Sequence, residues 1–535
     1  MSLANDTGSG PHGPLDLLVI NATAILGGVR DEQYRIDPGT ALGIANRRIA
    51  WIGPTADARP ETAARVIDAK GMLLLPGLIN THNHLFQNLV KGMGDEMYLL
   101  PWVETLILPT VDEMTPEECY LGAMLGCLEA IRSGTTALMD FMFGIPNIEV
   151  HRAVMRAMRD TGIRGFFGRA TRDLNPDSGW RDPWYLPLDE VFEQMRTLAR
   201  EFPSGLPVPS VLPAPGTMRT MTVGGLIRVK EYALSEGCQI TIHMGEHTEE
   251  RETSIDRWGI GAFQKGEEIG FLGPQVVAAH CVKLDRDDLE VIARTGTQVS
   301  FNPVSNMYLG NGFAPVLEML EMGIDVSLAS DGGACGNSED MLEVLKFGVL
   351  QPKAVAQDPR VFNARDALRL ATAGGARALG LGADLGALEV GRLADMFLFD
   401  PYRLKTVPMH DPISTVVYTG AQSNVHTVII DGNVVLDAGL FPNIDEEAFV
   451  REVQERSIAL AERVGTFRLM RGRRFTPFHY DRVGTAGAGS ATRAGDEGAA
   501  RQAPRPRPVS ADGYGGPPAS APERPEQGVP SREGT

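Results

Sequence analysis

Apolar runs of strand length alternate with amphipathic stretches of helix length through the middle of the chain. TTALMDF (135–141) is followed by a helix-like stretch at 148–162 and then by IRGFFGRAT (163–171). Four further strand-like runs, CQITIHMGE, QVVAAHC, TQVSF and IDVSLAS, lie between residues 238 and 330. Such alternation predicts a parallel sheet with crossover helices, and the number of units suits an α/β fold with a TIM-like (β/α)8 barrel over residues 76–384.

Both ends of this region carry a different pattern. Residues 15–75 hold the runs LDLLVINATAIL, ALGIANRRIAWIG and ARVIDAKGMLLL, broken by Gly, Pro, Asn and Asp as in antiparallel strands. Similar punctuation returns at 385–440, in GALEVGRLADMFLFDP and HTVIIDGNVVLDAG. We predict that residues 15–75 and 385–440 together form one small β-sandwich domain.

The C-terminal residues divide into two parts. We predict a helical extension over residues 441–481. Residues 482–535 are dominated by Gly, Ala, Pro, Ser and Arg, with almost no large apolar side chain. Such a segment cannot bury enough surface to offset the entropy of ordering, so the sequence predicts a disordered tail.

Charge and hydropathy exclude several classes of function. The formal net charge of −18 disfavours nucleic acid as a partner, because binding to a duplex requires many Lys and Arg contacts to phosphates. No apolar run approaches the ~20 residues that span a bilayer, and the first residues lack the pattern of a secretory signal. Five scattered cysteines without C-x-x-C spacing indicate neither a disulfide framework nor a zinc ribbon. We expect a cytoplasmic enzyme that binds a small molecule, has no membrane partner and forms a homo-oligomer.

Histidines and acidic residues follow the predicted strands. Two histidines one residue apart in THNHLF project to the same side of a strand end, which in a barrel is the mouth. Each residue alone also fits a capped turn or a buried structural histidine. Their common position at carboxyl strand ends favours a site instead, and its members are His82, His84, His243, Glu246, His280 and Asp331.

These residue types suit a catalytic metal. Zinc accepts His nitrogen and Asp oxygen and can leave a position open for water, so we predict one divalent ion on His82, His84, His243 and Asp331. Zinc is the expected ion and Fe²⁺ the alternative, since the ligands suit both. The ion would lower the pKa of its water towards ~7. Glu246 is then the predicted proton carrier, and His280 the group that polarises the developing tetrahedral centre.

The order of motifs resembles a known family. H-x-H after PGLIN, the strand with H-x-x-E, AAHCVKL, NPVSNMYLGNG, the Asp of ASDGG and GALEVGRLADMFLFDP are similar, over residues 15–440, to the amidohydrolase superfamily. Within it, the chain resembles aminohydrolases of guanine, 8-oxoguanine, adenosine-type thioethers and s-triazines. The resemblance implies the same four ligands and the same acid/base pair. Relatives with two metals carry a bridging Lys on the fourth strand, and VPSVLPAPGT lacks one, which implies a single metal.

Departures from the family pattern bear on the substrate. Thioether deaminases carry an acidic residue before the Trp of the first loop, where this chain has Pro101 before Trp102. Gln87 matches a ring-binding amide of oxopurine and pterin aminohydrolases, although it also fits a helix start. Asn302 follows Phe301 where many relatives have His-Asn or His-Cys. Arg169 and Arg172, in GRATRD after the third strand, could also face the substrate, although at least one of them better fits a surface ion pair. The predicted substrate-binding residues are Gln87, Trp102, Arg169 and Asn302.

The sequence predicts a metal-dependent hydrolytic deaminase that releases ammonia from an aminated nitrogen heterocycle such as an oxopurine, pterin or s-triazine. Alternatives are an adenosine-type thioether deaminase, or an amide hydrolase or chlorohydrolase with the same site. A non-catalytic scaffold is disfavoured because every ligand and acid/base position is filled.

Overall fold

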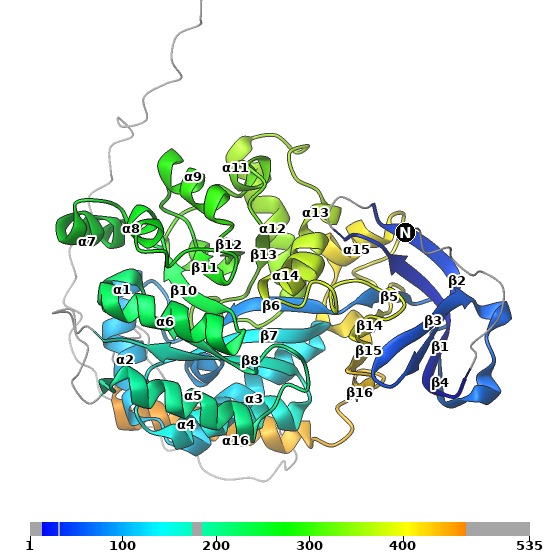
Figure 1. Ribbon diagram of the computed structural model, residues 1–535. Helices are drawn as coiled ribbons and strands as arrows, with labels where there is room; N and C mark the ends of the chain where they lie inside the picture. Colours follow the sequence, from blue (N-terminus) through cyan, green and yellow to red (C-terminus); the bar gives the residue numbers. More distant parts are fainter. Residues whose placement is uncertain (1–12, 30–32, 174–183, 467–535) are drawn as a thin grey trace, which may run out of the picture. The chain divides into compact units, whose positions relative to one another are not determined.

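The strands of the middle region form two parallel sheets of four strands each (Figure 1). The computed structural model describes residues 13–29, 33–173 and 184–466, which belong to a unit spanning residues 1–480. The first sheet has the order β6 (Leu78–Asn83), β7 (Thr135–Met142), β8 (Arg164–Thr171) and β9 (Val211–Pro215). The second has the order β10 (Ile240–Met244), β11 (Val276–His280), β12 (Gln298–Phe301) and β13 (Val326–Leu328). The predicted α/β class with parallel sheets is confirmed.

Helices connect these strands. They include α3 (Pro116–Arg132), α4 (Ile148–Thr161), α5 (Leu188–Glu201), α6 (Val223–Glu236), α7 (Thr248–Trp258), α8 (Ala262–Glu268), α9 (Arg286–Thr295), α10 (Pro303–Tyr308), α11 (Val316–Glu321) and α12 (Met341–Ala356). In α4 the hydrophobic residues recur at helical spacing, and the helix begins at Asn147, whose side chain accepts from the backbone N–H of Glu149. It ends at Gly162, which has the left-handed backbone that favours glycine.

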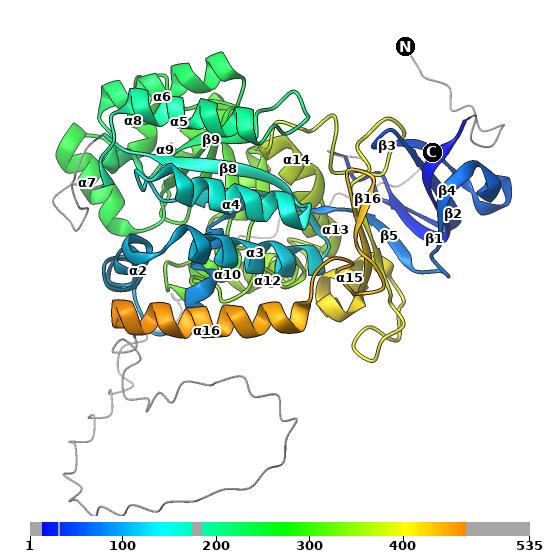
Figure 2. The same cartoon turned by 90° about the horizontal axis from the view of Figure 1, so that it is seen from below.

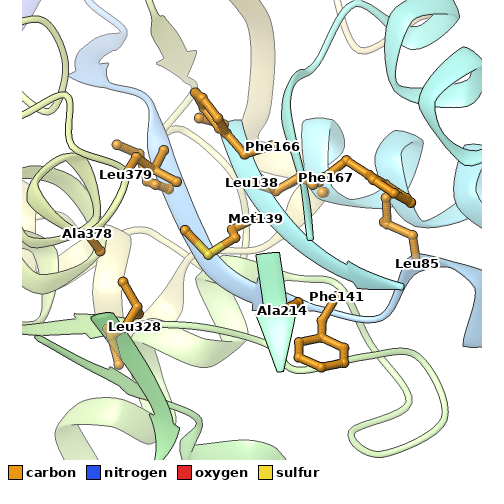
Figure 3. Packing of buried hydrophobic residues seen from close by; sticks show 14 of the residues in the cluster. Leu85, Leu138, Met139, Phe141, Phe166, Phe167, Ala214, Leu328, Ala378 and Leu379 are labelled. Atoms are coloured by element: carbon orange, nitrogen blue, oxygen red, sulfur yellow. The ribbon is translucent and has the colours of Figure 1, made fainter. Parts of the chain in front are cut away.

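Single backbone bridges join the two sheets at both of their edges. One bridge pairs Thr217, after β9, with His243 on β10, and the other pairs Asn83 on β6 with Asp331, after β13. Both faces of β7 and β8 are buried, as consecutive residues such as Leu138 and Met139 or Phe166 and Phe167 show, and Leu328 of β13 belongs to the same cluster (Figure 3). The bridges place the end of β6 beside that of β13, and the end of β10 beside that of β9.

Segments from both ends of the chain share one sheet. Its order is β16 (Asn433–Leu436), β15 (Val425–Ile430), β14 (Met396–Phe399), β5 (Leu73–Pro76), β1 (Leu15–Leu26), β2 (Arg35–Ala45) and β3 (Arg48–Pro54), and β4 (Ala63–Asp68) pairs with β1. Strand β14 lies antiparallel between β5 and β15, so it joins the late strands to the early ones. Because β6 begins directly after β5, this sheet is continuous in the chain with the first strand of the site.

The long helix α16 (Glu446–Val464) follows, within the predicted extension 441–481. It packs near α2 (Leu108–Glu113) and α3 (Figure 2). Arg463 of α16 forms an ion pair of 2.7 Å with Glu118 of α3, whose side chain is buried. The predicted tail 482–535 lies outside the described residues. Within the part of the chain that is described, no helix is both long and apolar enough to cross a membrane.

Candidate active site

The two histidines of THNHLF lie at the junction between β6 and a 3-10 helix, η3 (Leu85–Val90). His82 is inside the strand and fully buried, and His84 is the residue that begins the helix. The backbone N–H of Leu85 donates to the Asp140 carboxylate over 2.8 Å, which fixes this turn against β7. Both imidazoles therefore leave the strand end in defined directions.

Backbone carbonyls hold His84 and His243 in one tautomer. Nδ1 of His84 donates to the carbonyl oxygen of Phe141 over 2.7 Å, and Nδ1 of His243 donates to that of Gly216 over 3.0 Å. The hydrogen of each neutral ring is thus on Nδ1, and the Nε2 lone pair is available. The two Nε2 atoms face each other at 3.3 Å.

Asp331 completes this group from the end of β13. Its backbone N–H donates to the carbonyl oxygen of His82 over 3.1 Å, and its φ of 77° is in the left-handed region. Its Oδ1 lies 3.2 Å from Nε2 of His82 and 3.5 Å from Nε2 of His84. An aspartate in this unfavourable backbone conformation persists only because the surrounding structure holds it, as is common at functional sites.

Burial and charge set the protonation of the group. Burial lowers the pKa of His82, His84 and His243, that of His84 to about 3, so the three imidazoles are neutral. Burial opposes the ionised form of Asp331, but the nearby His280 and His82 lower the pKa of this carboxyl well below its usual range. Neutral imidazoles and an ionised carboxylate are the forms in which these side chains bind metals.

The same atoms fit a divalent cation. Two nitrogen lone pairs 3.3 Å apart with no hydrogen between them repel each other unless a cation lies between. Nδ1 of His82 is buried without a hydrogen-bond partner among the described residues, and its buried Nε2 lies 3.2 Å from the Asp331 carboxylate without the alignment of a hydrogen bond. A buried polar atom without a partner is costly, and an ion would satisfy it. Two sets of three residues, which share His82, could each hold an ion, because the ligand atoms within each set lie within 4.8 Å of one another. The sets are His82, His84 and His243, and His82, His280 and Asp331.

Glu246 and His280 lie beside this group. Nε2 of His280 is 3.8 Å from Oε1 of Glu246 and 4.0 Å from Oδ2 of Asp331. Burial raises the pKa of Glu246. Burial works against the charged form of His280, but the carboxylates of Glu246 and Asp331 raise its pKa above the ordinary value. The pair thus consists of a carboxyl that can accept or release a proton and an imidazole that favours its cationic form.

A cavity of about 110 Å³ opens over these side chains. His84, His243, Glu246, His280 and Asp331 all line it. An apolar wall faces them and comes mainly from α1 (Leu99–Trp102) and the residues after it: Leu99, Leu100, Trp102, Val103 and Leu108. Buried charged groups opposite an apolar wall are typical of a site for a small molecule.

The predicted substrate-binding residues divide into two groups. Gln87 and Trp102 line the cavity, but Arg169 and Asn302 do not. The buried guanidinium of Arg169 donates to the carbonyl oxygens of Ala170 and Ile145 and to the side-chain oxygen of Gln194. These bonds hold Arg169 outside the cavity, whereas Arg172 lines it.

Other residues of the site were not predicted. Arg219, in a 3-10 helix (Met218–Thr220), also lines the cavity, as do Thr217, which begins that helix, and His247, which begins α7. Ser305, Asn306 and Asn311 contact the predicted site residues directly. Only NPVSNMYLGNG signalled these last three, as a motif of polar residues after a strand.

Known proteins are similar to this chain over most of its length. Residues 73–435 match the sequence profile of the Amidohydrolase family. The chain is 36% identical over 438 residues to a 5-methylthioadenosine/S-adenosylhomocysteine deaminase of Syntrophobacter fumaroxidans, covering 81% of this chain and 95% of the relative. It is 35% identical over 452 residues to a 5'-deoxyadenosine deaminase of Methanosarcina mazei, covering 84% of this chain and all of the relative.

Solved structures are similar over the same region. A zinc-containing adenosine deaminase from Xanthomonas campestris superposes with a TM-score of 0.76 at 27% identity, covering 85% of this chain and 100% of that one. An atrazine chlorohydrolase from Arthrobacter aurescens has a TM-score of 0.76 at 24% identity, covering 83% and 99% of the two chains. The second likeness shows a shared fold alone.

Proposed function

This chain belongs to the amidohydrolase family, and we propose that it deaminates the aminated purine of an adenosine-type nucleoside by hydrolysis, with one divalent metal. The observation that carries the proposal is the convergence of His82, His84, His243 and Asp331, of which the last three line one cavity together with Glu246. A hydrolase of this kind acts on a carbon–nitrogen bond of a cyclic amidine and releases ammonia.

The proposed metal ligands are His82, His84, His243 and Asp331. A divalent ion held there supplies Lewis acidity, which lowers the pKa of water and makes it nucleophilic at neutral pH. Zinc is our preferred ion because the ligands are nitrogen and oxygen donors and the Xanthomonas campestris relative contains zinc. Fe²⁺ is the alternative that the same ligands accept.

Glu246 and His280 divide the proton transfer. The raised pKa of Glu246 suits a carboxylate that takes a proton from the attacking water and delivers it to the leaving amino nitrogen. His280 lies 3.8 Å from that carboxylate and favours its cationic form, so it can stabilise the negative charge that develops on the ring. Neither side chain is needed to complete the proposed ligand set.

The substrate class follows from the relatives and the cavity together. The sequence alone favoured an oxopurine, pterin or triazine, because Pro101 replaces an acidic residue of thioether deaminases. The names of the relatives support the alternative, an adenosine-type substrate. In this proposal Gln87 binds the ring, because an amide can both donate and accept, and Trp102 with its apolar neighbours packs against the substrate.

The architecture proposed for this function is a closed barrel with a β-sandwich domain. The bridges at both edges of the two parallel sheets support closure into eight strands. Two buried clusters on the sheet built from both chain ends support a sandwich. One contains Leu17, Val19 and Leu398, and the other contains Leu15 and Leu18. The site would then lie at the carboxyl mouth of the barrel. Assembly into a homo-oligomer stays a prediction.

A substrate screen tests the proposal. Zinc-loaded protein would be incubated with 5'-deoxyadenosine, 5'-methylthioadenosine, S-adenosylhomocysteine, guanine, a pterin and a chlorinated aminotriazine, and ammonia and chloride would be measured. We expect ammonia from at least one of the three nucleosides, with a higher kcat/KM than from the other compounds. Ammonia from guanine or the pterin alone would overturn the substrate class, and chloride without ammonia would overturn deamination.

A further inference from the structure

A single short segment contacts three functional side chains that come from three different strands. The segment consists of α10 and the turn after it, residues 302–311, and it follows β12. Its Ser305 hydroxyl donates to Oδ2 of Asp331, its Asn306 amide faces His280, and its Asn311 amide faces Glu246. The three partners follow or end β13, β11 and β10, so the segment bridges loops that are far apart in the sequence.

Asn306 controls the orientation of His280. Oδ1 of Asn306 lies 3.0 Å from Nδ1 of His280, and both residues are buried. With the amide oxygen accepting, Nδ1 of His280 is a donor whether the ring is neutral or cationic, and Nε2 faces Glu246 and Asp331. Nδ2 of Asn306 has no hydrogen-bond partner among the described residues, so the contact with His280 is the bond that its side chain makes.

Asn311 controls the orientation of Glu246. Nδ2 of Asn311 donates to Oε1 of Glu246 over 3.0 Å, and this is the same oxygen that faces His280. Both side chains are buried, so the hydrogen bond is shielded from water. The bond directs one carboxylate oxygen towards His280 and restricts rotation of the side chain.

The segment itself is held firmly. The backbone N–H of Asn306 donates to the carbonyl oxygen of Asn302 over 3.1 Å, and that of Asn311 donates to the carbonyl oxygen of Asn306 over 2.9 Å. Between them, Gly310 has a φ of 68°, which allows the chain to turn. The two amides are therefore fixed relative to each other, and each determines the position of one member of the acid/base pair.

We propose that Asn306 and Asn311 are positioning residues that set the ring orientation of His280 and the rotamer of Glu246 for proton transfer. The inference rests on the proposed deaminase function for its kinetic consequence but not for its structural one. The two positions need different groups. His280 needs a hydrogen-bond acceptor at position 306, and Glu246 needs an N–H donor at position 311.

The same isosteric substitution tests both positions with opposite expected results. Asn306→Asp keeps an acceptor for His280, whereas Asn311→Asp replaces a donor with a carboxylate that repels Glu246. With a nucleoside that the parent deaminates, we expect Asn306→Ala and Asn311→Ala to lower kcat by about 10- to 100-fold while KM changes only a few-fold. Asn306→Asp should return kcat to within a few-fold of the parent, and Asn311→Asp should lower it at least as far as Asn311→Ala.

Zinc content and a control variant separate a positioning role from a general structural role. Zinc content should match the parent in all four variants. Asn424→Ala is the matched control, because Asn424 is a buried amide that donates to the Asp400 carbonyl oxygen and the Thr406 hydroxyl, remote from the cavity residues. We expect this control to lower the melting temperature and leave kcat within a few-fold. Equal loss of kcat in Asn424→Ala, or equal effects of Asp at positions 306 and 311, would overturn the proposal.

Nitrogen NMR of ¹⁵N-histidine-labelled, zinc-loaded protein provides a readout without substrate. The His280 signals, identified by their loss in His280→Gln, should report a hydrogen on Nδ1 in the parent and in Asn306→Asp, and a changed pattern in Asn306→Ala. An unchanged pattern in Asn306→Ala would overturn the inference, whatever the substrate. Failure of all nucleosides to react would instead count against the proposed function, because the NMR result does not depend on turnover.

Discussion

The partner of the Nδ1 atom separates His84 and His243 from His280. His84 and His243 donate to backbone carbonyls, which fixes their tautomer and leaves Nε2 as a ligand atom. His280 faces a side-chain amide instead, and nearby carboxylates raise its pKa. Identical side chains a few ångströms apart therefore have different chemistry because their hydrogen-bond partners differ.

Glu246→Gln tests the separation of metal binding from proton transfer. The substitution is nearly isosteric and changes no proposed ligand, so we expect full zinc content and nucleoside binding. Because the amide cannot carry the proton, kcat should fall by at least ~10²-fold. His243→Ala should lower zinc content and activity together. Zinc is measured by elemental analysis and kcat by ammonia release.

Glu249→Gln is the matched control for this prediction. Glu249 lies on α7 close to Glu246, but its side chain is 61% exposed and does not line the cavity. We expect its kcat to stay within a few-fold of the parent. Turnover of Glu246→Gln at the same level as Glu249→Gln would exclude Glu246 as the proton carrier.

Strands and their carboxyl ends were predictable, because hydrophobic runs mark strands and side chains alternate faces along them. That periodicity placed His82, His243 and His280 near strand ends, as the structure does. Arg169 shows what this periodicity cannot predict. The alternation does not say which of two neighbouring residues faces the interior, and here Arg169 is held by Ile145 and Gln194 outside the cavity.

Contacts between loops were beyond prediction. Asn306 and Asn311 reach His280 and Glu246 only because β10, β11 and β12 lie side by side in the sheet. Sequence periodicity describes one strand at a time and carries no information on which loop tips meet. The motif that contains both asparagines was visible, but the targets of their amides were not.

A buried ion cluster joins β8 to the sheet built from both chain ends, and its loss should be costly. Arg164 donates to both carboxylate oxygens of Asp395, over 2.9 and 2.8 Å, and to Asp431 over 2.9 Å. Both Arg164 and Asp395 have side chains less than a tenth exposed. Asp395→Ala leaves part of a buried guanidinium unpaired, so we expect the free energy of unfolding to fall by about 3 kcal/mol in urea titrations.

An exposed ion pair provides the comparison. Arg286 and Glu290 form an i,i+4 pair on α9, with side chains 67% and 49% exposed. Glu290→Ala should change the free energy of unfolding by less than about 0.5 kcal/mol, since solvent screens such pairs. Equal effects of Asp395→Ala and Glu290→Ala would mean that the buried cluster does not stabilise the junction.

The sheet built from both ends of the chain is connected directly to the strand that carries the first proposed ligand. Strand β14 pairs with β5, and only Gly77 separates β5 from β6, which carries His82. A Cβ atom at position 77 would lie 2.0 Å from the Thr136 hydroxyl, so the backbone at Gly77 approaches β7 closely. Formation of the sheet built from both chain ends therefore fixes the start of β6, the strand on which the first proposed ligand lies.

Because the proposed ligands come from β6, β10 and the end of β13, a metal should stabilise the whole fold against unfolding. An ion that binds only the folded chain raises the free energy of unfolding by about 2.7 kcal/mol at one hundred times its Kd. Removal of the metal with a chelator should therefore lower the urea midpoint, and added zinc should restore it. His243→Ala should lose this response, whereas His426→Ala, on β15, should keep it because the His426 side chain hydrogen-bonds to the neighbouring Thr427 and is not a proposed ligand. A parent protein that is free of metal but unfolds at the same urea concentration as the zinc-loaded form would contradict binding by ligands from three strands, because such binding must link those strands in the folded state.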